Sequence, residues 1–75
     1  MSDVGLVLSD PIRAKIFKAI CEGEDPEEVA KRARIPSLLL KREITFLVEK
    51  GLITQSEGRY VPTDKGKRVY ESIDW

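Results

Sequence analysis

Two aspartate–proline pairs, Asp10-Pro11 and Asp25-Pro26, constrain the fold of this chain more than any other feature. Aspartate accepts hydrogen bonds from the free N–H groups at a helix start, and proline suits the first helical position because no N–H donor is needed there. We therefore expect one helix to begin at each pair.

Apolar residues recur at helical intervals after the first pair. Ile12, Ile16 and Ile20 repeat every four residues, and Gly23 is suited to end that helix. A second, shorter helix is expected to end at residues 34–36, because the residue before a proline is disfavoured in helical geometry.

A third helix is predicted over residues 37–50, with Ser37 as its cap and Gly51 just beyond its end. Its inward face is predicted to hold the apolar residues at spacings of three and four, namely Leu40, Ile44, Leu47 and Val48. The opposite side is predicted to carry Leu38, Lys41, Arg42, Thr45 and Glu49.

The segments 52–56 and 59–61 are short strand candidates, and Glu57-Gly58 between them is a two-residue hairpin turn. Pro62 ends the second strand, and Thr63 can cap a last short helix. The predicted fold is therefore mainly α with a small β-hairpin. A length of 75 residues suits one domain, residues 1–75, rather than two.

The chain carries 13 basic and 13 acidic side chains, so its net charge does not indicate a nucleic-acid partner. The distribution is uneven: residues 22–28 hold five acids, whereas residues 31–50 and 59–68 are rich in lysine and arginine. Two interpretations stay open, a local positive face for a polyanion and an ordinary solvated helix surface.

Several function classes are excluded by what the sequence lacks. There is no histidine and only one cysteine, Cys21, which falls in an apolar stripe, so we expect no metal, no cofactor and no catalytic nucleophile–base pair. The single cysteine fits a reducing cytoplasm. No apolar run is long enough to span a bilayer, and no secretory signal is seen.

Residues 8–13, followed by Ile16, Phe17 and Ile20, resemble the opening helix of ArsR-like regulators. Residues 30–53, which end in the segment 47–53, resemble the helix-turn-helix and wing entry shared by ArsR-like and MarR-like proteins, and residues 60–67 are similar to the wing exit of those families. The resemblance covers roughly residues 8–73 and implies a winged helix-turn-helix fold. In that fold the helix at 37–50 would be the recognition helix in the DNA major groove, and the hairpin would be the wing.

The resemblance, with the chemistry of the side chains, implies a set of DNA-binding residues. They are Arg34, Ser37, Leu38, Lys41, Arg42, Thr45 and Arg59. Arginine and lysine reach guanine edges or phosphates, hydroxyl groups bind phosphates or bases, and leucine touches a thymine methyl group.

The sequence departs from the family pattern in three places. Leu38, Leu39 and Phe46 stand where polar residues are usual, and they either touch DNA, form an apolar patch for a protein partner, or broaden the core face. Arg34 replaces a glycine, so the turn is expected to be remodelled or strained. The wing carries a single arginine, Arg59, beside Glu57.

Two functions follow from these features. The first is a DNA-binding transcriptional regulator, not an enzyme, expected to act as a homodimer with residues 1–9 as an apolar dimer contact. The alternative is a winged-helix interaction module within a larger complex, which would use Leu38, Leu39 and Phe46 against a protein partner.

Overall fold

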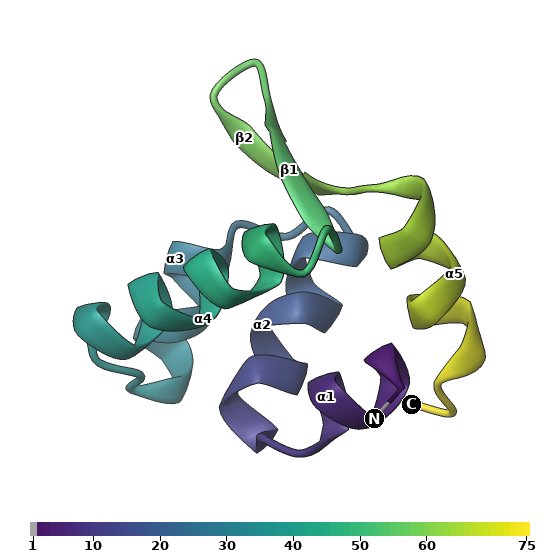
Figure 1. Ribbon diagram of the computed structural model, residues 1–75. Helices are drawn as coiled ribbons and strands as arrows, with labels where there is room; N and C mark the ends of the chain where they lie inside the picture. The colour runs from purple at the N-terminus through teal and green to yellow at the C-terminus, as the bar shows by residue number, and fades with distance from the viewer. Residues whose placement is uncertain (1) are drawn as a thin grey trace.

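The computed structural model describes residues 2–75, which form five helices and one two-stranded antiparallel sheet (Figure 1). The elements in chain order are α1 (Asp3–Leu8), α2 (Pro11–Cys21), α3 (Pro26–Ala33), α4 (Ser37–Glu49), β1 (Ile53–Ser56), β2 (Arg59–Pro62) and α5 (Asp64–Ser72). The predicted class, mainly α with a small hairpin, is confirmed.

Both aspartate–proline pairs begin helices as predicted. The Asp10 carboxylate accepts hydrogen bonds from the backbone N–H groups of Ile12 and Arg13. Asp25 accepts one from the N–H of Glu27 at 2.9 Å. These bonds satisfy donors that a helix start otherwise leaves unpaired, which is why α2 and α3 start where the sequence indicates.

Helix α1 was not predicted from the sequence. The hydroxyl of Ser2 caps it by accepting from the N–H of Gly5, and Val7 is fully buried. A salt bridge of 3.3 Å between Asp3 and Lys65 joins α1 to α5. Residues expected to serve a dimer contact are therefore partly used inside the fold, while Leu8 is 50% exposed.

Helix α2 lies at the centre and packs against every other helix and against β2 (Figure 1). The side chains buried around it form one apolar core. They are Val7, Ile16, Phe17, Ile20, Ala30, Leu40, Leu47, Leu52, Ile53, Val69 and Ile73. This core draws on all five helices and β1, so it fixes α4 relative to the rest of the fold.

The hairpin forms at the predicted turn and projects away from the helices (Figure 1). Ser56 pairs with Arg59, and the two residues between them, Glu57 and Gly58, have φ values of 53° and 78°. Two consecutive positive φ values match the tight turns that suit the twist of a hairpin. At its base, Ile53 is buried in the core, which anchors the projecting strands.

Helix α5 approaches the chain just before the hairpin very closely. Thr63 caps it as predicted, accepting from the N–H of Gly66 at 3.0 Å and donating to the carbonyl of Gly51 at 2.6 Å. A Cβ atom at Gly66 would lie 2.0 Å from the carbonyl oxygen of Leu52. Only glycine therefore permits this contact between α5 and the hairpin base.

Candidate nucleic-acid interface

One face of α4 is exposed along its length. Leu38, Lys41, Arg42 and Thr45 are all exposed, and their spacing of three and four residues puts them on one side of the helix. We call these four residues the α4 ridge. The structure thus brings four of the seven predicted site residues together on one surface.

The inward face of α4 differs from the prediction at two positions. Leu40 and Leu47 are buried as predicted, but Val48 is 43% exposed. Glu43, which the sequence did not mark, is buried and accepts a hydrogen bond from Arg13. Its position, three residues after Leu40 and four before Leu47, was the available signal of an inward carboxylate.

The start of α4 also differs from the prediction. Pro36, not Ser37, occupies the capping position, and α4 has no side-chain capping hydrogen bond. The other four helices within residues 2–75 each have one. Ser37 is instead the first, exposed residue of α4, so its hydroxyl stands beside the uncapped N–H groups at the start of the ridge.

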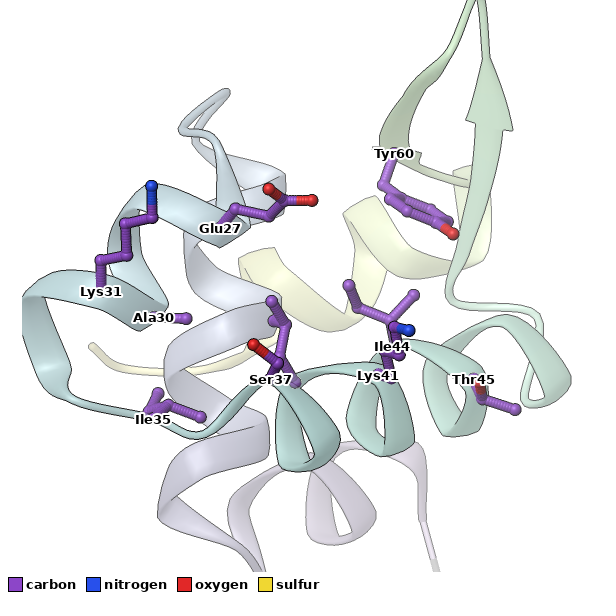
Figure 2. Close-up of a pocket in the computed structure, with 10 residues that line it drawn as sticks. Glu27, Ala30, Lys31, Ile35, Ser37, Lys41, Ile44, Thr45 and Tyr60 are labelled. Atoms are coloured by element: carbon purple, nitrogen blue, oxygen red, sulfur yellow. The ribbon is translucent and has the colours of Figure 1, made fainter.

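A groove of about 510 Å³ runs between α3, α4 and β2, and Figure 2 shows the Tyr60 ring of β2 facing Ile44 of α4 across it. Ser37, Lys41 and Thr45 line its α4 edge. Lys41 and Thr45 also line a shallower hollow on the opposite flank of α4. Because hollows lie on both sides, the α4 ridge stands out between them.

The cations of the ridge form no ion pair with any residue of the described range, 2–75. Within residues 2–75, neither Lys41 nor Arg42 lies in a salt bridge, whereas Arg32 of α3 pairs with Glu24 at 3.0 Å. Two exposed cations outside salt bridges favour the approach of an anion despite the neutral total charge, although Glu49 lines the same hollow as Lys41 and Arg42. An anion can approach this ridge without displacing an acidic partner.

Arg34 ends α3 in the left-handed conformation, with φ 57° and ψ 41°. The next residue, Ile35, donates its N–H to the carbonyl of Ala30 at 2.8 Å, which is the hydrogen bond that closes a Schellman motif. The turn was expected to be either remodelled or strained because arginine replaces the usual glycine. It is strained, since Arg34 adopts the left-handed conformation that glycine would adopt. Its exposed side chain lies in the turn that leads into α4.

Arg59 lies at the hairpin and does not line the same groove as the α4 ridge. It lines a second groove, beyond Tyr60, together with Glu24, Asp25 and Glu27. Carboxylates beside the wing arginine offset its charge and repel phosphate groups. Arg59 therefore lines a groove next to the one along α4, and the two grooves share Glu27, Ile44 and Tyr60.

The three apolar residues that depart from the family pattern have different environments. Leu39 and Phe46 are half-buried, and the Phe46 ring packs under the Arg13 guanidinium, 3.8 Å from its carbon to the ring centre. Leu38 is 72% exposed. Of these three residues, Leu38 therefore has the side chain that is most exposed to solvent and open to a binding partner.

Cys21 is half-buried in α2, and burial together with the nearby charge of Glu22 raises the pKa of its thiol to about 12. A thiol with so high a pKa is a poor nucleophile and metal ligand. Within residues 2–75, no group of histidine, cysteine, aspartate or glutamate side chains is arranged to hold a metal ion. No helix in this range has the length and apolar character that crossing a membrane requires.

A family model described as winged helix-turn-helix matches residues 9–75. No curated protein and no solved structure matches the chain. The match spans the helices α2 to α5 and the hairpin, which supply every residue of the core except Val7 of α1 and which present the α4 ridge. This chain therefore belongs to the winged helix-turn-helix family, whose domains are typically DNA-binding.

Proposed function

We propose that the protein is a DNA-binding transcriptional regulator of the ArsR-like or MarR-like type, with α4 as its recognition helix. The observation that carries the proposal is the α4 ridge, an exposed helix face with two unpaired cations and a hydroxyl group. The B-DNA major groove is about 12 Å wide and admits one α-helix.

The chemistry of the ridge suits distinct contacts. Arg42 carries the planar fork of donors that pairs with guanine O6 and N7, and Lys41 is a point charge suited to a phosphate. Thr45 and Ser37 supply hydroxyl groups, and the uncapped start of α4 offers backbone N–H donors to a phosphate. Arg34, three residues before Ser37 in the turn between α3 and α4, adds a cation that precedes this end of the helix.

The proposal also covers the oligomeric state of the protein and its cellular location. One recognition helix covers a half-site, so the regulator acts as a homodimer on two half-sites about one helical turn apart. The exposed Leu8 of α1 supports a dimer contact from residues 1–9. We propose that residues 1–75 form one domain and that the protein works in the cytoplasm, without a cofactor and without enzymatic activity.

A fluorescence-anisotropy titration with labelled random duplex DNA tests the proposal. Binding should be measurable at low salt and fall steeply at physiological salt, because phosphate contacts release counterions. The double variant Lys41→Ala/Arg42→Ala should bind at least tenfold more weakly, whereas Arg68→Ala on α5 serves as the matched control. Absence of binding by the native protein at low salt would contradict the proposal and favour a protein partner.

A further inference from the structure

Leu38 is the one exposed apolar side chain on the α4 ridge, at the second position of the helix. It is 72% exposed, while Leu40, two residues on, is only 8% exposed. The other three ridge residues are polar or charged. The Leu38 side chain is therefore open to contact with another molecule.

The surroundings of Leu38 favour a polyanion over an apolar protein surface. Lys41 and Arg42 follow it by three and four residues, so both lie next to it on the helix, and neither is in a salt bridge within residues 2–75. Leu39 and Phe46 are half-buried and do not extend Leu38 into a broad patch. A protein interface needs a much larger apolar area than one side chain provides.

Duplex DNA offers an apolar group that matches a single leucine. In the major groove, the 5-methyl group of thymine is the apolar feature of the base edges, and the other edge groups are hydrogen-bond donors or acceptors. A leucine next to two cations thus fits a methyl group that lies among polar base edges and near phosphates. The geometry requires only that α4 enters the groove by its N-terminal half.

We propose that Leu38 is a specificity-determining residue that packs against the 5-methyl group of a thymine, an inference that rests on the proposed function. Arg42 lies four residues further along the helix, about 6 Å at a rise of 1.5 Å per residue. Base pairs are 3.4 Å apart. The preferred half-site therefore contains a thymine within about two base pairs of the guanine that Arg42 contacts.

The test begins with selection of a preferred sequence from random duplexes by the native protein. Each thymine of the selected duplex is then replaced by deoxyuridine, which removes the methyl group and keeps every hydrogen-bonding atom. At one position per half-site, this change should weaken binding of the native protein about fourfold. That factor corresponds to about 0.8 kcal/mol for one buried methyl group, at 1.4 kcal/mol per tenfold.

Leu38→Ala should bind the thymine and uracil duplexes equally, with an unchanged dependence on salt. Val48→Ala, which shortens another exposed apolar residue of α4, should keep the fourfold preference. Circular dichroism checks that both variants are folded, as the exposure of both positions leads us to expect.

The outcomes separate the two proposals. If the native protein binds duplex DNA but no uracil substitution weakens it, the thymine contact is wrong and the proposed function stands. The same holds if Leu38→Ala retains the preference, because another residue then contacts the methyl group. If the native protein binds no duplex DNA at low salt, the proposed function and this inference both fail.

Discussion

Oε1 of Glu43 in α4 accepts a hydrogen bond from Nε of Arg13 in α2, with 2.7 Å between the two atoms. The side chains are 7% and 15% exposed, so the pair is largely shielded from water. Nη1 of Arg13 also donates to the carbonyl of Leu6 in α1 at 2.7 Å. One guanidinium therefore joins three helices and holds α4 in the orientation that exposes its ridge.

Arg13→Ala should leave the Glu43 carboxylate buried without its partner, a loss that typically destabilises a protein by about 3–5 kcal/mol. Domains of this size have a free energy of unfolding of only ~3–5 kcal/mol, so about half or more of this variant should be unfolded at 25 °C. Glu43→Gln keeps an acceptor for Arg13 and should be destabilised by only about 1 kcal/mol. Urea denaturation followed by circular dichroism measures both variants.

A double variant distinguishes loss of a partner from loss of packing. Arg13→Met/Glu43→Leu replaces the ion pair with apolar side chains of similar length and should recover most of the stability. A double variant as unstable as Arg13→Ala would show that the link to Leu6 and the packing on Phe46 matter more than the buried charge.

Gly66→Ala should destabilise the fold by about 1–3 kcal/mol, because the added methyl group meets the backbone carbonyl of Leu52 rather than a movable side chain. Lys67→Ala, the next residue of α5 and exposed, should change stability by less than about 0.5 kcal/mol. Thermal unfolding of the two variants provides the comparison. Equal melting temperatures would mean that α5 shifts freely away from the hairpin base.

Arg34→Gly should raise the free energy of unfolding by about 1 kcal/mol, because glycine adopts a φ of 57° without the steric strain that a Cβ atom imposes. Arg34→Ala keeps the Cβ atom and should leave stability nearly unchanged. Both variants should bind DNA more weakly if the Arg34 side chain contacts phosphate. A stability gain in the alanine variant would point to charge, not backbone strain, as the cause.

Arg42→Ala and Lys41→Ala should affect DNA binding in different ways. If Arg42 contacts a guanine edge, its removal should cost about 1–3 kcal/mol and relax the preference at one position of the selected sequence. Lys41→Ala should weaken all sequences alike and reduce the slope of log K against log salt by about 1. Competition titrations over a salt series measure both effects, and unchanged affinity in both variants would reject the α4 ridge as the contact face.

Alkaline pH should lower stability, with Cys21 as one cause. Burial raises the pKa of its thiol from 9.0 to about 12 in the folded chain, so above pH 9 the unfolded chain releases a proton that the folded chain retains. The contribution of protonated Cys21 to the free energy of unfolding is therefore complete below pH 9, and it is lost as the pH rises toward 12. The pKa of Tyr70 is raised as well, because its hydroxyl donates to Glu22, and it acts in the same direction.

Denaturant midpoints measured between pH 7 and pH 11 test this dependence. Cys21→Ala should show a shallower decline above pH 9 than the native protein, while the two should run parallel below that pH. Parallel curves over the whole range would contradict the assignment to Cys21.

Local sequence signals were sufficient for most of the fold. The caps at Asp10, Asp25 and Thr63 bond to N–H groups two or three residues away, and the Glu57-Gly58 turn joins adjacent strands. Such interactions are complete within one short segment, so the residues of that segment determine them. The exposed ridge of α4 was predictable for the same reason, since helical periodicity alone puts Lys41, Arg42 and Thr45 on one side.

The tertiary structure decided the features that depend on contacts between residues far apart in the sequence. Helix α1 has six residues, too few to be stable alone, and it forms because Val7 enters the core and Asp3 pairs with Lys65. Glu43 is buried because Arg13, 30 positions earlier, reaches its carboxylate. Arg59 lies beside the acids that precede and begin α3 because folding brings the hairpin next to that helix. A single segment carries no information about a partner that only folding supplies.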